Sequence, residues 1–265
     1  MMTITKRRFS LGIAALALFA SVCGAQAQTV LDDILKAKQI RVAIPTDFAP
    51  YGFVDADLHP QGLDIDMANY VGAKLGVKVL LVPVTSANRI PYLQTRKVDI
   101  VISTLGKNPD REKAIDFTVA YSPFFIGVFG PKVMAVKSGA DLAGKSIAVT
   151  RGSMDDMELT KIAPATAGLR RFEDNNTTIS AYMAGQTQLV ATSVQVADVM
   201  MKKSPQMGTE FKFVLKVSPN FIGLSKNEDK LRSRLNEILM EAKKSGELDK
   251  LSQKWLSRPA GDLPE

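Results

Sequence analysis

The stretch that decides the fold spans residues 98–118 and reads VDIVISTLGKNPDREKAIDFT. It opens as an apolar strand, and Ser103, Thr104 and Gly106 follow where that strand ends. The NPD turn and Arg111 come next, at the start of a helix pattern. The turn is either a solvated surface turn or a carboxylate clamp in which hydroxyls and backbone N–H groups act with a bidentate guanidinium. The stretch alone leaves both interpretations open.

Outward from this stretch, short apolar strands alternate with helix patterns along the chain. The expected strands cover residues 40–44, 77–84, 98–104, 187–193, 212–217 and 221–225, and residues 142–153 are expected to form a turn and a strand. The expected helices cover residues 64–76, 86–97, 154–163, 179–185, 194–203 and 230–246, with a final short helix that holds Trp255. This alternation is typical of βαβ units around mostly parallel sheets. Two such series, separated by the apolar link SPFFIGVFG at 122–130, predict two α/β lobes.

The first 27 residues have the pattern of a secretory signal peptide. Lys6, Arg7 and Arg8 precede an apolar run, and Ala25 and Ala27 stand at the −3 and −1 positions of a small-residue cleavage site. We expect cleavage after Ala27 and a periplasmic location for the mature protein.

Two other export signals compete with this interpretation. A lipobox at Cys23 is disfavoured because the bulky Val22 precedes the cysteine. A twin-arginine signal is disfavoured because Lys6 takes the place of the first arginine, although the choice of export route stays open. A membrane span is not expected, since the apolar run is shorter than the roughly 20 residues that a spanning helix needs.

Composition excludes several classes of site. Removal of residues 1–27 lowers the formal net charge from +7 to +4, and no Lys/Arg tract remains, which argues against nucleic-acid binding. Cys23 leaves with the signal, so no disulfide or cysteine metal ligand is expected. His59 is the single histidine and lies in a polar loop, which argues against a His-based triad or a multi-histidine metal site. We expect no catalytic residue, metal or cofactor.

Four segments, in this order, resemble the periplasmic amino-acid-binding proteins (family 3 type) that serve ABC importers. They are QGLDIDMANYVGAKLG at 61–76, RKVDIVISTLGKNPDREKAIDFTVAY at 96–121, DLAGKSIAVTRGSMDD at 141–156 and KNEDKLRSRLNEILMEAKKSGELDKLSQKWL at 226–256. No single segment is decisive, but four in the correct order make a chance match unlikely, and the resemblance extends over essentially the whole mature chain.

The resemblance implies a type II periplasmic binding protein fold, with two α/β lobes that each hold a mostly parallel sheet flanked by helices. Lobe 1 would comprise residues 28–123 and 223–258, and lobe 2 would comprise residues 124–222 with hinge strands at its ends. Residues 259–265 would form a tail. The ligand would lie between the lobes, at the carboxyl ends of the strands.

The resemblance also assigns ligand contacts in lobe 1. Arg111 would hold the ligand's α-carboxylate, while Ser103 and Thr104 would contact its carboxylate and ammonium groups. Gly106 occupies a place often held by serine or threonine, so its backbone N–H remains but a hydroxyl contact is lost. Phe48 would pack on the aliphatic part of the ligand, or else between the lobes.

In lobe 2, the resemblance assigns contacts to the turn after the strand at 142–153. Ser153 and the backbone N–H of Met154 would cover the ligand carboxylate from the other side, as a turn at a helix N-terminus favours an anion. Arg151 either reaches the ligand or faces solvent. The family often has an acid at the place of Ser193, where it pairs with the ligand ammonium.

Without that acid the usual amino-acid clamp is incomplete, because a buried ammonium needs a carboxylate partner. A second acidic position of the family is Pro45 in this chain. Ser86 and Arg89 resemble the residues that hold the side-chain carboxylate in glutamate/aspartate-binding members, although Arg89 could also be a helix-surface residue. Two arginines with no acidic counterweight would favour an anionic ligand.

These features predict a non-enzymatic, monomeric binding protein. It would close on a small amino acid or related carboxylate and present it to an ABC permease of the inner membrane. One alternative is an enzyme that resembles cyclohexadienyl dehydratases on the same fold, which Ser193 and the lack of a His or Cys in the site disfavour. Another is a sensor that presents its ligand to a receptor.

Overall fold

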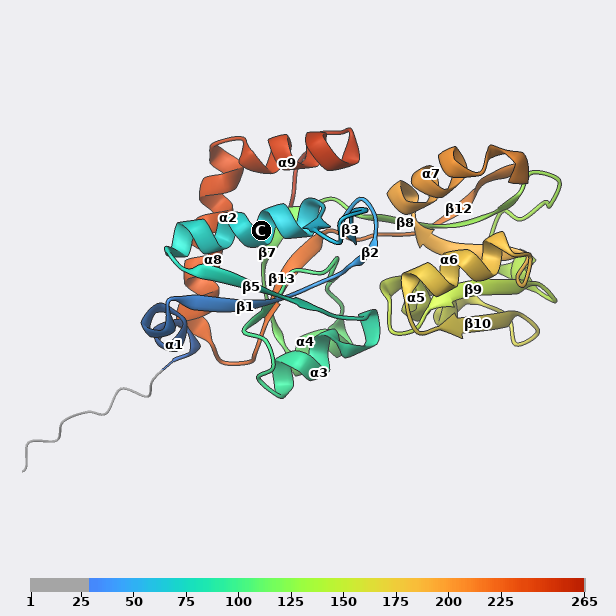
Figure 1. Cartoon of the computed structure of the whole chain (residues 1–265). Coiled ribbons are helices and arrows are strands. Elements are labelled where there is room, and N and C mark those ends of the chain that lie inside the picture. Colours follow the sequence, from blue (N-terminus) through green and yellow to red (C-terminus); the bar gives the residue numbers. More distant parts are fainter. Residues whose placement is uncertain (1–28, 265) are drawn as a thin grey trace, which may run out of the picture.

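The computed structural model describes residues 29–264, and the predicted signal peptide lies outside them. Two five-stranded sheets organise this part of the chain (Figure 1). The first sheet has the order β5 (Lys78–Pro83), β1 (Gln39–Ile44), β6 (Ile100–Val101), β13 (Asn220–Leu224) and β7 (Asp116–Ser122). The second has the order β10 (Gly168–Phe172), β9 (Ser146–Thr150), β11 (Leu189–Ser193), β8 (Phe125–Pro131) and β12 (Thr209–Val217). We call the two bodies built on these sheets lobe 1 and lobe 2.

Helices cover both sheets. In lobe 1 they are α1 (Val30–Ala37), α2 (Leu63–Leu75), α3 (Arg89–Gln94), α4 (Pro109–Ala114), α8 (Asp229–Lys244) and α9 (Glu247–Leu256), with the 3₁₀ turn η1 (Ser86–Asn88). In lobe 2 they are α5 (Met154–Ile162), α6 (Asn175–Met183) and α7 (Val194–Lys203), with the 3₁₀ turns η2 (Gly139–Leu142) and η3 (Pro205–Met207). None of these helices is both long enough and apolar enough to cross a membrane.

Each sheet is mixed, with parallel pairs at one side and antiparallel pairs at the other, so the pairing is less parallel than the βαβ pattern predicts. Strand β1 pairs in parallel with β5 and β6, and β9 pairs in parallel with β10 and β11. Antiparallel strands complete the sheets, because β13 runs against β6 and β7, and β8 runs against β11 and β12. The predicted two-lobe α/β fold of the type II class is confirmed.

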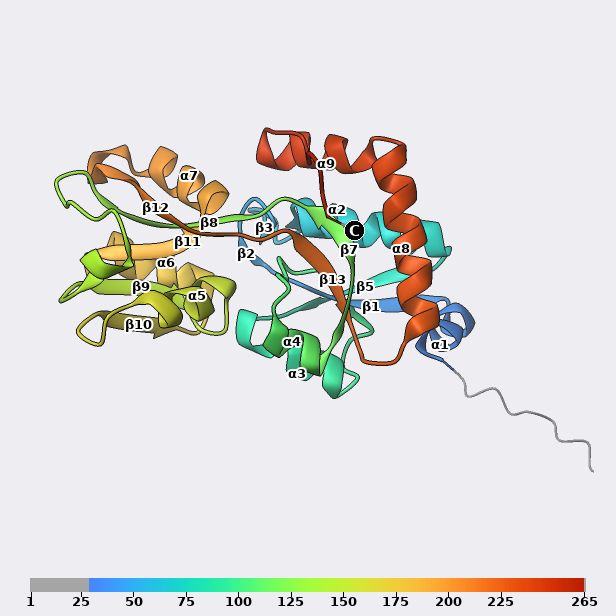
Figure 2. The same cartoon turned by 180° about the vertical axis from the view of Figure 1, so that it is seen from behind.

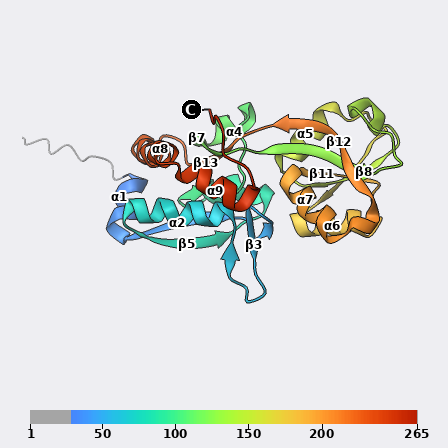
Figure 3. The same ribbon diagram turned by 90° about the horizontal axis from the view of Figure 1, so that it is seen from above.

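The chain passes between the lobes twice. One passage joins β7 to β8, and the other joins β12 to β13 (Figures 2 and 3). The two passages run side by side, since Phe125 pairs with Val217 where β8 and β12 leave lobe 2. Two adjacent extended segments of this kind are suited to act as a hinge.

A small sheet of β2 (Asp47–Phe48), β3 (Gly52–Val54) and β4 (Pro60–Gln61) extends lobe 1 beside the gap between the lobes. The sequence analysis did not predict it. His59 lies in its exposed β3–β4 connection, as expected for a solvated loop residue. Phe48, at the end of β2, is buried and reaches the lobe interface.

Candidate functional site

A small cavity separates the two lobes at the carboxyl ends of their strands. Its volume is about 10 Å³, and it is lined by Phe48, Ser86, Arg89, Thr104, Phe124, Ser153, Met154, Asp155 and Asn175. Six of these were expected from the sequence, and Phe124, Asp155 and Asn175 were not. A space of this size holds about one water molecule.

The turn after β6 forms the lobe 1 wall of the cavity. Thr104 has a φ of +43°, which is unusual for a β-branched residue and marks local strain. Its backbone N–H donates to the buried carboxylate of Asp64 at 2.9 Å, and the Tyr121 hydroxyl donates to the other oxygen at 2.7 Å. Burial raises the pKa of Asp64 to about 7. Asp64 therefore holds the strained turn in place.

Arg111 is buried beneath this turn. Asn108 caps α4 by accepting a hydrogen bond from the Arg111 backbone N–H at 2.9 Å, which fixes the start of the short helix. The guanidinium donates to the carbonyl of Gly106 at 2.8 Å and to the carbonyl of Gly152, in lobe 2, at 3.0 Å. Burial lowers the pKa of Arg111 to about 10, so the group stays cationic at neutral pH. Arg111 does not itself line the cavity.

Arg89 lines the cavity and is also buried, so it is not a helix-surface residue. Its guanidinium donates to the carbonyls of Ser103 at 2.8 Å, Thr104 at 3.1 Å and Gly152 at 3.3 Å. Burial, followed by the nearby charge of Arg111, lowers the pKa of Arg89 to about 9. Ser103 thus contributes its carbonyl to the framework of the site rather than lining the cavity.

The carbonyl of Gly152 is the point where both arginines reach lobe 2. Gly152 has a φ of +70°, and a Cβ at this position would lie 3.0 Å from the Cα of Ala87 in lobe 1. Glycine therefore allows the β9–α5 turn to approach lobe 1 closely. Gly106 has a similar role on the other side, since a Cβ there would lie 2.7 Å from the Met154 side chain. A serine or threonine at position 106 would require the Met154 side chain to move.

Asp155 supplies a carboxylate that the sequence analysis did not assign to the site. It lies in the first turn of α5, is 5% exposed, and its Oδ1 has no hydrogen-bond partner within the described residues. Burial raises its pKa to about 6, against the opposing effects of hydrogen bonds from its own backbone N–H and the Ser153 hydroxyl and of the Arg89 and Arg111 charges. The expectation of two arginines without an acidic counterweight was therefore wrong. The sequence signal was an acid directly after Ser153 and Met154, which we interpreted only as a helix start.

The remaining lobe 2 residues have clear structural positions. Ser153 and Ser193 are the N-caps of α5 and α7, and their hydroxyls accept backbone N–H bonds at 3.1 Å. Ser193 is fully buried at the end of β11 and does not line the cavity. Arg151 is exposed and pairs with Glu173 at 2.8 Å, so it faces solvent rather than the cavity.

Aromatic rings close the side of the cavity nearest the hinge. Phe48 stacks on Tyr51 with ring centroids 5.7 Å apart, and Phe124 lies 5.3 Å from Tyr51. The Tyr51 hydroxyl donates to Gln195 of lobe 2 at 3.0 Å. Phe48 thus both lines the cavity and packs at the lobe interface.

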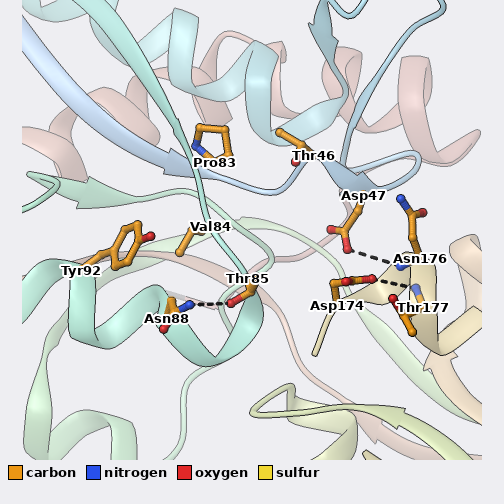
Figure 4. Close-up of a pocket in the computed structure, with 10 residues that line it drawn as sticks. All are labelled: Thr46, Asp47, Pro83, Val84, Thr85, Asn88, Tyr92, Asp174, Asn176 and Thr177. Carbon is orange, nitrogen blue, oxygen red and sulfur yellow. Dashed lines mark hydrogen bonds between the residues drawn. The ribbon is translucent and has the colours of Figure 1, made fainter. Parts of the chain in front are cut away.

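A larger pocket of about 400 Å³ lies beside the cavity, between the ends of β1 and β5 and the start of α6 (Figure 4). Asp47, Asp174 and Asn176 lie on the side of the pocket formed by the start of α6, and the Asp174 carboxylate accepts from the Thr177 backbone N–H (Figure 4). The Asp47 carboxylate accepts from the backbone N–H of Asn175 at 2.7 Å and so joins lobe 1 to the N-terminus of α6. The pocket is the wider opening next to the buried site.

Known proteins similar to this chain are amino-acid-binding proteins. A probable histidine-binding protein of Neisseria gonorrhoeae is 25% identical over 261 residues, which cover 97% of each chain. An ancestral arginine-binding protein, solved with bound arginine, is 31% identical with a TM-score of 0.78 and covers 82% of this chain and 98% of its own. An ancestral amino acid-binding protein described as a precursor of cyclohexadienyl dehydratase is also 31% identical, with a TM-score of 0.77 and coverage of 86% and 99%.

The match to a family model agrees with the lobes, the hinge and the buried charged site. The model of the bacterial extracellular solute-binding proteins, family 3, matches residues 40–258, which include both sheets and every residue that lines the cavity. The chain belongs to this family of solute-binding proteins.

Proposed function

We propose that this protein is the extracytoplasmic substrate-binding component of an ABC importer, which closes on an amino acid and delivers it to a membrane permease. The observation that carries the proposal is a buried inter-lobe site that contains both signs of charge, with Arg89 and Arg111 in lobe 1 and Asp155 in lobe 2. Its position between two hinged lobes suits a ligand that is enclosed by closure. The similar proteins reported above are described as histidine-binding and arginine-binding, which supports an amino acid as the ligand.

In this proposal, Arg111 binds the ligand carboxylate when the lobes separate and its contact with the Gly152 carbonyl is released. Ser153 and Met154, at the start of α5, line the cavity, and the N-terminus of a helix suits an anionic group. Thr104 and Ser86 line the opposite wall. The earlier preference for an anionic ligand is not retained, because Asp155 offsets the charge of the arginines.

A thermal-shift screen of amino acids, dicarboxylates and keto acids tests the proposal. A ligand that binds the folded state alone raises its stability by RT ln(1 + [L]/Kd), which is about 2.7 kcal/mol at one hundred times Kd. We expect at least one amino acid to raise the melting temperature at sub-millimolar concentration. A screen with no response to any amino acid would contradict the proposal.

A second candidate is the dehydratase chemistry considered above, because Asp155 places a carboxyl group with a pKa of about 6 in the cavity. Such a group could act as a general acid near neutral pH. Incubation with prephenate and with arogenate, monitored for phenylpyruvate and phenylalanine, separates this candidate from the binding protein. We expect no turnover, since Ser193 takes the place of the family's acid at the end of β11 and no His or Cys is among the described residues that line the cavity.

We further propose that residues 1–27 are removed on export and that the mature, monomeric protein is periplasmic. The intact mass of the exported protein should correspond to a chain that begins at Gln28. A lipid-modified Cys23 at the N-terminus would contradict this. The division into residues 28–123 and 223–258 against 124–222 is likewise proposed, with both crossings between the sheets close to its boundaries.

A further inference from the structure

Asp155 is a buried carboxylate whose hydrogen bonding is incomplete. Its side chain lines the inter-lobe cavity, and Oδ1 has no partner within residues 29–264. A buried polar atom without a partner costs free energy, and a charged one costs more. Native structures keep such groups mainly where a function uses them.

The two nearest cations do not supply those bonds. Arg89 donates to backbone carbonyls of residues 86, 103, 104 and 152, and Arg111 donates to those of residues 106 and 152. Their charges favour the ionised form of Asp155, although neither guanidinium donates a hydrogen bond to it. The two arginines therefore favour a negatively charged Asp155 that can attract a hydrogen-bond donor. Their own N–H groups donate to backbone carbonyls instead.

The cavity presents charges of opposite sign on its two walls. Lobe 1 contributes the guanidinium of Arg89, and lobe 2 contributes Asp155 beside the cap residue Ser153. A small molecule with an anionic and a cationic group on neighbouring atoms matches this pattern better than a dianion does. Ser193, at the end of β11, offers no charge, and its hydroxyl already accepts from the Val196 backbone N–H.

We propose that Asp155 binds the ammonium group of an amino-acid ligand, and that it replaces from the start of α5 the acid that Ser193 does not supply at the end of β11. The inference rests on the proposed function and adds to it the residue that binds the ligand's ammonium group. It makes the site selective for α-amino acids over 2-hydroxy acids that are otherwise the same. A hydroxyl in place of the ammonium leaves Asp155 without its ionic partner.

Calorimetry on three proteins tests this inference. They are the wild type, Asp155→Asn, and the control Asp262→Asn, which removes the same charge from an exposed position. A screen of the common amino acids first identifies the tightest binder. The calorimetric probes are then that amino acid, L-glutamate, L-leucine and L-phenylalanine, each paired with its 2-hydroxy acid. The melting temperature of each variant shows whether it is folded.

We expect the wild type and Asp262→Asn to bind the best amino acid at least a hundredfold more tightly than its 2-hydroxy acid. Asp155→Asn should lose roughly a hundredfold in affinity for the amino acid, as expected when one partner of a buried charge pair is removed. Its affinity for the hydroxy acid should stay the same or rise.

Two results would overturn the inference and leave the proposed function intact. One is amino-acid affinity in Asp155→Asn within threefold of the wild type, and the other is equal wild-type affinity for the amino acid and its hydroxy acid. Binding of hydroxy acids alone, or of no probe at all, would instead contradict the proposed function together with the inference.

Discussion

Asp155 and Arg111 approach the same buried space from opposite lobes, and burial changes the chemistry of both. The pKa of Asp155 rises to about 6 and that of Arg111 falls to about 10, with desolvation as the largest cause in each case. Each charged form is therefore costly in the protein as it stands. A ligand of complementary charge would relieve both costs, so the site is poised for binding at the expense of stability.

The cost at Asp155 predicts a pH-dependent stability. The folded-state pKa of about 6 lies above the ordinary value of 3.8. Folding therefore favours the neutral acid, and this contribution is present below about pH 4 and lost as the pH rises through 6. The charged groups that face Asp155 are Arg89 and Arg111, and the Tyr51 phenol is also near.

Asp155→Asn removes the ionisation and nearly keeps the shape. A shift of about two pKa units corresponds to about 3 kcal/mol, so the ligand-free variant should be more stable than the wild type by up to about that amount at pH 8. The difference should shrink towards pH 4. Urea unfolding at both pH values measures it, and a difference that is equal at pH 4 and pH 8 would contradict the assignment.

Arg111→Lys tests the planar fork of the guanidinium. Lysine keeps the charge but cannot bond two groups in one plane, so affinity for the best amino acid should fall by about 2 kcal/mol or more. Arg151→Lys is the matched control, since Arg151 is exposed and pairs with Glu173. Calorimetry that finds the same loss in both variants, or none in Arg111→Lys, would remove Arg111 from the site.

The sequence indicated the arginines of the site but not its acid. Arg111 lies in the family-like segment that follows a strand, and Arg89 lies in a segment that resembles one in glutamate/aspartate-binding members. Asp155 lies in a helix start, where acids are common because they favour the N-terminal end of the helix dipole. Only the close approach of the β9–α5 turn to lobe 1 separates Asp155 from an ordinary first-turn acid, and that approach is not visible in the sequence.

At the scale of elements, helices α2, α7 and α8 were predicted to within a few residues because their patterns and ends are clear. Helix α6 begins at Asn175, ahead of the expected 179–185, because Asp174 caps it by accepting from the Thr177 backbone N–H at 2.7 Å. Strand β6 is limited to Ile100–Val101, since the following residues turn away from the sheet to form the site. The small β2–β4 sheet was missed, because its strands are too short for a periodic pattern.

The cap of α5 positions the lobe 2 wall, which leads to a prediction about Ser153. Ser153→Ala removes the acceptor for the Asp156 backbone N–H and should lower stability by about 1 kcal/mol. Ser180→Ala, at an exposed position within α6, should be neutral or slightly stabilising. Urea unfolding compares the two. Equal stabilities would mean that the hydroxyl does not hold the start of the helix.

At the scale of the whole molecule, hydrogen bonds between the lobes leave too little room for an amino acid. The cavity measures about 10 Å³, and contacts such as Tyr51 with Gln195 and Arg111 with the Gly152 carbonyl join its two walls. A ligand can therefore enter only when the lobes rotate apart about the paired crossings of β8 and β12. The contacts between the lobes then stabilise the closed form, and the greater conformational entropy of the open form opposes them.

Asp47 makes one of the contacts that favour the closed form. Its carboxylate meets the N-terminus of α6 across the lobe gap, where a negative charge is stabilised by about 0.3–2 kcal/mol. Asp47→Ala should therefore lower the ratio of closed to open molecules by about 2- to 30-fold.

Small-angle scattering without ligand should give a larger radius of gyration for Asp47→Ala than for the wild type or for Asp57→Ala, an exposed control in the same small sheet. A saturating amino acid should return the variant to the wild-type value, because ligand contacts replace the lost one. Identical ligand-free scattering from all three proteins would show that Asp47 does not hold the lobes together.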